Sequence, residues 1–319
     1  MRVGTGSLVP SPLPAARRVA SPVPALVPGE VLRYQLEYRS TIQSASAGPI
    51  YTPEAAHQMD VSLSSRLRLD VLSVKADPKF GPLTRLRVTY ETSDALVHTD
   101  AYDPGAQALE KQYNSLAGRS FEFSVDGEGR VLEVAGLGRL EPDERARSAV
   151  RQWLGTLALP LGLWRKGVKP GKRWSRVVPL ADAPLAGLAW RTKSFYSGNQ
   201  PCPRTPGAPA SLARETCAVI ETRIDTVREH GSHDPTPLAY SRQGLRTKGS
   251  WTGRGESQNY LSLATGLVTN CTATDTNAMN LTITAALGGS ALHYAGRWRS
   301  SSQLTLVGFH VPAPAPQAP

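Results

Sequence analysis

The chain has 319 residues, of which 40% are hydrophobic and 19% charged, so it is long enough to bury a substantial core. Its formal net charge of +10 attracts anions in general, but the basic residues are scattered, and we expect no nucleic-acid partner. No apolar stretch approaches the roughly 18 residues that a transmembrane helix needs, so we expect no membrane span.

The two ends of the chain differ in composition from its centre. Residues 1–29 are rich in Pro, Ala and Arg and contain no acidic residue, and residues 309–319 form a Pro/Ala tail. Both segments are expected to be disordered. The Arg17-Arg18 pair is not followed by an apolar region, so residues 1–29 hold no recognisable export signal. We expect one folded domain over residues 30–308.

The first half of that domain alternates apolar and polar residues with the period of a strand. Residues 31–38 open the predicted sheet. Leu67 and Leu69 share one face of the next strand, and Leu86 and Val88 share one face of the strand after it. Such half-buried alternation is typical of antiparallel sheets with one face on the core and one in solvent.

The segment from Arg119 to Trp174 predicts a hairpin followed by a helix. Strands at 121–125 and 130–134 flank the turn Asp126-Gly-Glu-Gly129, whose glycines allow positive φ. A helix is then predicted over 141–158, with acidic residues and proline in its first turn. One side of this helix carries an apolar stripe, formed by Val150, Trp153, Leu154 and Leu157.

Strands resume after the helix, and Thr265-Gly266 and Gly288-Gly289 predict two of the turns between them. The predicted strands cover 173–180, 187–197, 216–229, 238–252, 256–264, 267–276, 279–286 and 291–308. The fold class is therefore mainly β within α+β: a large, strongly curved antiparallel sheet or half-barrel with one central amphipathic helix.

Three cysteines are present, and two of them flank a proline-rich loop. A Cys202–Cys217 disulfide would close a loop of 16 residues, 202–217 inclusive, and stabilise the fold by roughly 3 kcal/mol. It would also indicate an oxidising compartment, so we expect a periplasmic or extracellular protein. The alternative is two unpaired thiols. Cys271 is interpreted as a small buried strand residue.

Catalytic and metal-binding signatures are absent from the sequence, so we predict no cofactor and no enzyme activity. There is no G-x-S-x-G elbow, P-loop or H-E-x-x-H motif. The best metal candidate is the pair His230 and His233, but a flexible polar loop makes a poor preformed site, and we interpret both residues as part of a solvated loop. A hydrolase whose residues assemble only in the folded chain stays open as an alternative.

Four arginines alternate with apolar residues on two neighbouring predicted strands: Arg66, Arg68, Arg85 and Arg87. If these strands pair, the guanidinium groups crowd one surface, where they would bind an anionic lipid headgroup or another polyanion. Ordinary solvent exposure of the polar face of the sheet is the alternative.

The order of elements resembles that of LolA/LppX-type periplasmic half-barrels, which bind lipids and lipoproteins. The residues that carry the resemblance are 121–134, the helix at 141–158, 168–174 and the hairpin at 259–268. The resemblance implies a curved sheet with helical cover and a lipid ligand. The chain departs from the pattern in its missing export signal and its larger number of strands.

Two functional hypotheses follow. In the first, a non-catalytic envelope or secreted protein holds a lipid or other apolar small molecule against the apolar stripe of the helix, with arginines at the rim. In the second, side chains fill the same space, and the protein is a scaffold or an interaction module with an envelope protein as partner. The sequence does not define the oligomeric state.

Overall fold

The computed structural model describes residues 26–48, 57–78, 81–100, 102–140, 150, 154–155, 157–158, 167–180, 183–204, 206–207, 209–210, 212–228 and 235–311. The strands are β1 (Val31–Ala47), β2 (His57–Asp77), β3 (Gly81–Thr99), β4 (Ser120–Val125), β5 (Val131–Ala135), β6 (Arg173–Pro179), β7 (Leu188–Pro201), β8 (Thr216–Arg228), β9 (Leu245–Ser262), β10 (Val268–Ala285) and β11 (Leu292–His310). The helices are α1 (Pro104–Asn114), α2 (Leu137–Leu140), the 3-10 turn η1 (Leu212–Arg214) and α4 (Leu238–Ser241).

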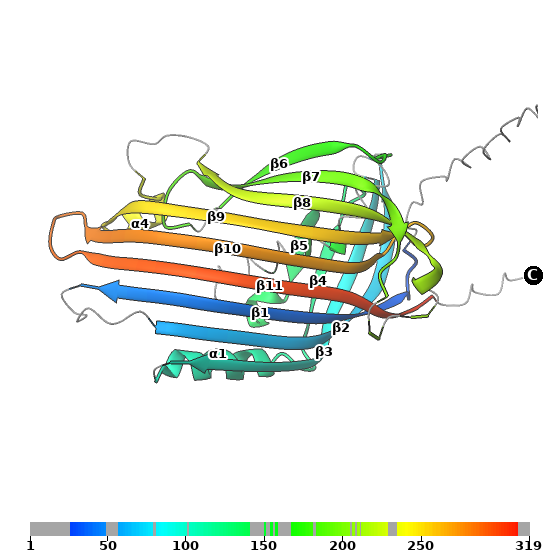
Figure 1. Cartoon of the computed structure of the whole chain (residues 1–319), viewed down its shortest axis with the longest axis horizontal. Helices are drawn as coiled ribbons and strands as arrows, with labels where there is room; N and C mark the ends of the chain where they lie inside the picture. The colour runs from blue at the N-terminus through cyan, green and yellow to red at the C-terminus, as the bar shows by residue number, and fades with distance from the viewer. Residues whose placement is uncertain are drawn as a thin grey trace, which may run out of the picture.

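All eleven strands form one antiparallel sheet, in the order β5-β4-β3-β2-β1-β11-β10-β9-β8-β7-β6. Every neighbouring pair is consecutive in the chain except β1 and β11, which bring the first and last strands together. The sheet stays open between β5 and β6, and the chain between these two strands contains the predicted helix. Figure 1 shows β4 and β5 behind the layer formed by β1 and β6–β11. The predicted mainly antiparallel β class is confirmed.

The strands are longer than the sequence predicts, most clearly in the second half of the sheet. Predicted strands at 238–252 and 256–264 are replaced by the short helix α4 and the single strand β9, and those at 267–276 and 279–286 are joined in β10. Glycines and polar residues in these segments look like breaks in the sequence. In the folded sheet they lie on paired strands, where backbone hydrogen bonds continue through them.

The helical content also differs from the prediction. The helix α1 was not predicted, although Asp103 accepts a hydrogen bond from the Gly105 N–H and Pro104 occupies the first turn, as is typical of a helix start. Within the predicted helix at 141–158, the described residues 150, 154–155 and 157–158 are helical. Residues 141–149, 151–153 and 156 lie outside the described part of the chain.

The two faces of the sheet have different roles, and we name them by what they contact. The inner face carries the main core cluster, to which β1, β2 and β11 contribute Leu32, Leu67 and Leu304. β4 and β8 contribute Phe123 and Ile220 to the same cluster, so strands from both halves of the sheet meet across one core. The outer face is formed by the alternate residues of each strand, which are mostly polar and charged.

Candidate functional site

The inner face begins as a packed core at one end of the strands. Leu154 is 0% exposed and Ala158 is 1% exposed, and both belong to the main core cluster. Val150 and Leu157 are half-buried and pack against it. The predicted apolar stripe therefore contacts the sheet through these residues, whereas Trp153 lies outside the described part of the chain.

Farther along the strands, the inner face becomes polar at the row formed by Ser40, Ser300 and Asp275, which are cross-strand neighbours on β1, β11 and β10. The Ser300 hydroxyl donates to one carboxylate oxygen of Asp275, and the Asn277 amide donates to the other at 2.6 Å. Burial raises the pKa of Asp275 against the opposing effect of these hydrogen bonds. Burial likewise raises the pKa of the nearby Tyr38 hydroxyl. This row is suited to holding a polar group of a ligand.

Beyond the polar row, the inner face carries three half-buried tryptophans, Trp190, Trp251 and Trp298, from β7, β9 and β11. The rings of Trp251 and Trp298 meet edge to face, with centroids 5.6 Å apart. Between these strands lies Gly253 of β9, over which Asn277 and Thr226 lean from the strands on either side. Sequence reasoning did not find this cluster, since it depends on the register of five strands.

The four predicted arginines lie on the outer face, away from Leu154. Arg85 and Arg87 both form ion pairs with Glu122, at 2.5 Å and 2.8 Å, and Arg68 pairs with Asp70 at 2.7 Å. Hydrogen bonds from Arg87 and Arg85 lower the pKa of Glu122. The β2–β3 pairing does bring the four arginines onto one surface, but three of them already form ion pairs with carboxylates. Because alternate residues of a strand point to opposite faces, all four lie on the face opposite the helix stripe.

A hollow of about 400 Å³ lies over the middle of β1, β10 and β11. Its lining residues are Arg39, Ser40, Thr41, Thr274, Asp275, Thr276, Arg299, Ser300 and Ser301. Six of these nine belong to the outer face by strand alternation, including both arginines. The hollow is therefore interpreted mainly as a basic groove of the outer face.

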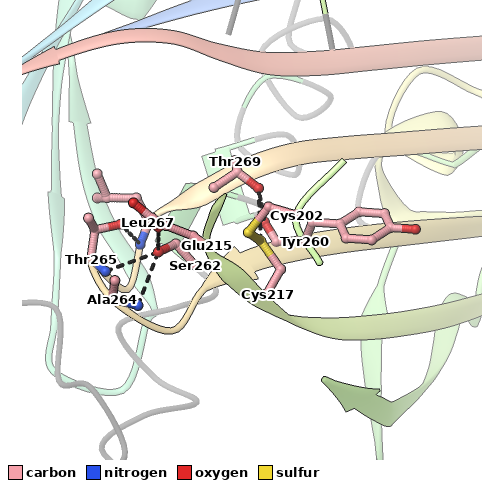
Figure 2. The surroundings of a disulfide bond; sticks show 9 residues. All are labelled: Cys202, Glu215, Cys217, Tyr260, Ser262, Ala264, Thr265, Leu267 and Thr269. Carbon is pink, nitrogen blue, oxygen red and sulfur yellow. Dashed lines mark hydrogen bonds between the residues drawn. A yellow bond between two sulfur atoms is a disulfide. The ribbon is translucent and has the colours of Figure 1, made fainter. Parts of the chain in front are cut away.

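The predicted disulfide is confirmed: Cys202 and Cys217 are bonded, with Cα atoms 5.0 Å apart. Figure 2 shows the bond beside the β9–β10 hairpin, where the Ser262 hydroxyl donates to Glu215 and accepts from the N–H groups of Ala264 and Thr265. The bond thus fixes the proline-rich loop to the start of β8. Cys271 is a buried free thiol, as predicted, and burial raises its pKa to about 12.

The remaining candidates give no metal or membrane site in the described residues. His230 and His233 lie outside them. Within the described ranges, no group of three or more His, Cys, Asp or Glu side chains is placed to hold a metal ion. None of the described helices combines the length and apolar character needed to cross a membrane.

No family model and no curated protein matches the chain. Among solved structures, lipovitellin, studied for its lipid–protein interactions, matches at 12% identity and a TM-score of 0.39, over 91% of this chain and 26% of the lipovitellin chain. OpdQ of Pseudomonas aeruginosa matches at 6% identity and a TM-score of 0.22, over 86% of this chain and 99% of its own. A mutant of the TodX monoaromatic hydrocarbon channel matches at 7% identity and a TM-score of 0.18, over 91% and 93%.

All three TM-scores lie below 0.5, so these likenesses establish neither a shared fold nor a shared function. They do not confirm the resemblance to LolA/LppX-type half-barrels.

Proposed function

We propose that the protein is a non-catalytic binding protein that holds an apolar or amphipathic small molecule, such as a lipid, on the inner face of its sheet. One observation supports this proposal above the others. Beyond the packed core, the inner face carries large apolar side chains that stay half-buried, among them Ile42, Met59 and the three tryptophans. A large apolar surface left partly open is characteristic of ligand or partner sites.

The disulfide supports an extracytoplasmic setting for this function. Disulfides persist in oxidising compartments and are rare in the cytosol. The Cys202–Cys217 disulfide therefore supports a periplasmic or extracellular location for the proposed binding protein.

The test is native mass spectrometry of the purified full chain, followed by titration with a fluorescent fatty acid. We expect a co-purifying apolar molecule and saturable fluorescence. Trp298→Ala should weaken fatty-acid binding, whereas Arg297→Ala, which changes the adjacent outer-face position of β11, should not. Unfolding curves of both variants separate lost binding from lost folding. Absence of both a bound molecule and saturable fluorescence would contradict the proposal.

A second function, that of a scaffold or interaction module, is favoured by the complete burial of Leu154. Side chains fill the space beneath that part of the helix, as a packed module requires. If this function is the correct one, fatty acid should not bind, and a protein that co-purifies with the chain should contact the half-buried side chains of the inner face in cross-linking experiments.

A further inference from the structure

The inner face of β8, β9 and β10 collects buried polar atoms that have no hydrogen-bond partner. Within the described residues these atoms are Thr226 Oγ1, Thr247 Oγ1, Trp251 Nε1, Asn259 Oδ1 and Asn277 Oδ1. The register places all five residues on the inner face of these three adjacent strands. Leaving a buried polar atom unpaired costs about 1–3 kcal/mol, so such a concentration on one face requires an explanation.

Two of these atoms, Asn277 Oδ1 and Thr226 Oγ1, lie close to Gly253, together with the ring of Trp190. A Cβ atom built on Gly253 would lie 2.2 Å from Asn277 Oδ1, 2.5 Å from Thr226 Oγ1 and 2.6 Å from the Trp190 ring. These neighbours therefore converge on one point from both sides of β9, and Asn277 is only 6% exposed. Trp251 lies two residues along the same strand on the same face. We call Trp190, Thr226, Trp251, Gly253 and Asn277 the Gly253 niche.

The missing partners have a defined chemistry. Asn277 Oδ1 accepts only, and its amide nitrogen already donates to Asp275, so it needs a donor. Trp251 Nε1 donates only, so it needs an acceptor. The unpaired Thr226 hydroxyl can do either. A carboxylate could therefore pair with the indole and with Thr226 but not with the amide oxygen, and an ammonium could pair with the amide oxygen and with Thr226 but not with the indole. A hydroxyl group satisfies either, because it both donates and accepts.

The tryptophan side chains further restrict the chemical class of ligand that would fit the niche. Trp190 belongs to the niche, and Trp298 stands edge to face with Trp251 across β10. Flat indole faces pack against the C–H face of a sugar ring while the hydroxyls of the sugar reach polar partners at the ring edge. An indole environment combined with unpaired donors and acceptors is therefore suited to an uncharged polyhydroxylated group.

From this geometry we infer that the Gly253 niche holds the sugar head group of an uncharged glycolipid-like amphiphile. The inference rests on the proposed function, since the apolar part of the same molecule would lie along the half-buried inner face. Binding reorients the Thr226 and Asn277 side chains toward the sugar hydroxyls, because both oxygens are enclosed in the free protein.

The test compares three probes by calorimetry on the full chain: dodecyl maltoside below its micelle-forming concentration, dodecanoate and maltose. We expect the maltoside to bind at least tenfold more tightly than dodecanoate. If dodecanoate binds as tightly, the inference is overturned and the proposed function stands. If neither amphiphile binds, the proposed function fails too. If maltose alone binds as well as the maltoside, the sugar site stands and the apolar-ligand function fails.

A matched pair of variants distinguishes a ligand site from a packing defect. Thr226→Val removes an unpaired buried hydroxyl, so its unfolding temperature should rise while maltoside binding weakens at least tenfold. Thr276→Val makes the same change on the exposed outer face and should alter neither. If Thr226→Val stabilises the protein without weakening maltoside binding, the niche is only a defect. Asn277→Leu provides a second variant with the same expected loss of binding.

Discussion

The Asn114 side chain pairs with the backbone of Ala95 as a neighbouring strand would. Its Oδ1 accepts from the Ala95 N–H at 2.7 Å, and its Nδ2 donates to the Ala95 carbonyl at 3.1 Å. Glu110 accepts from the Val97 N–H at 2.8 Å one step farther along. In this region β3 extends beyond its pairing with β4, so the end of α1 covers a sheet edge that would otherwise be open.

We predict that Asn114→Ala destabilises the protein by about 1–3 kcal/mol, because it leaves the Ala95 backbone groups without partners. Denaturant unfolding monitored by circular dichroism measures the change. Gln107→Ala, at an exposed position of the same helix, is the control for altered helix propensity and should cost less. Exposing the edge should also promote association at high concentration, which light scattering detects. Equal stability of Asn114→Ala and the native chain would contradict this role.

Reduction of Cys202–Cys217 should lower the free energy of unfolding by about 3 kcal/mol, since it releases the loop-closure constraint on the unfolded chain. Unfolding curves with and without reductant measure the change. Cys271→Ala is the matched control, because it removes the free thiol and leaves the bond intact. A thiol count on the denatured, non-reduced chain should give one; a count of three would contradict the bond.

Asp126 should be a stabilising carboxylate in the β4–β5 turn. Its side chain is buried and accepts from the N–H groups of Glu128 and Arg130, each at 2.9 Å, and from the Arg130 guanidinium at 2.7 Å. Burial alone would raise the pKa of Asp126, but these hydrogen bonds outweigh burial and lower it. Asp126→Ala should therefore cost about 2 kcal/mol at neutral pH.

The sign of the pH dependence for Asp126 follows from the lowered pKa. The stability that the ionised Asp126 carboxylate contributes is fully present above the ordinary pKa of 3.8. It is lost as the pH falls through the lower pKa of Asp126 in the folded protein. The difference in unfolding free energy between native chain and Asp126→Ala should shrink accordingly in acid. Glu128→Ala keeps the backbone N–H and should cost little, because the exposed Glu128 carboxylate lies 3.7 Å from Arg130. A constant difference from neutral to strongly acidic pH would argue against this assignment.

Local patterns were sufficient to predict much of the fold. Alternation correctly assigned Leu67 and Leu69 to the core, and the glycines after Asp126 correctly predicted the hairpin turn, because each depends only on neighbours in the chain. The proline-rich loop likewise indicated the disulfide. Lengths of strands were less predictable, since cross-strand pairing carries β9 through glycines that look like breaks.

The candidate site could not be predicted in the same way. Trp190, Thr226 and Asn277 are separated by 36 or more residues in the sequence, and only the register of β7–β10 brings them together over Gly253. Leu154 of the helix stripe is buried in the core, but alternation alone could not place the arginines relative to the helix. Their position on the opposite face follows from which side of the sheet the helix packs against.

Asp275 supplies the carboxyl group of the polar row. Burial raises its pKa, so the folded protein holds this proton more tightly than the unfolded chain does. The stability that Asp275 contributes is therefore greatest below the ordinary carboxyl pKa of 3.8, and it falls as the pH rises through the higher pKa of Asp275 in the folded protein. Relative to the native chain, Asp275→Asn should become progressively more stable as the pH rises across this window, because the amide does not ionise.

Asp60 on the outer face supplies the matched control. Hydrogen bonds from Thr41 at 2.6 Å and Gln58 at 2.9 Å lower the pKa of Asp60. The stability that its carboxylate contributes is therefore present above the ordinary pKa of 3.8 and is lost in acid. Asp60→Asn should thus become progressively less stable than the native chain as the pH rises, which is the opposite slope to Asp275→Asn. Unfolding free energies of the three proteins, measured from pH 3 to pH 7 at constant ionic strength, give both slopes. Slopes of the same sign would show that the two carboxyl groups do not lie in the contrasting environments of the inner and outer faces.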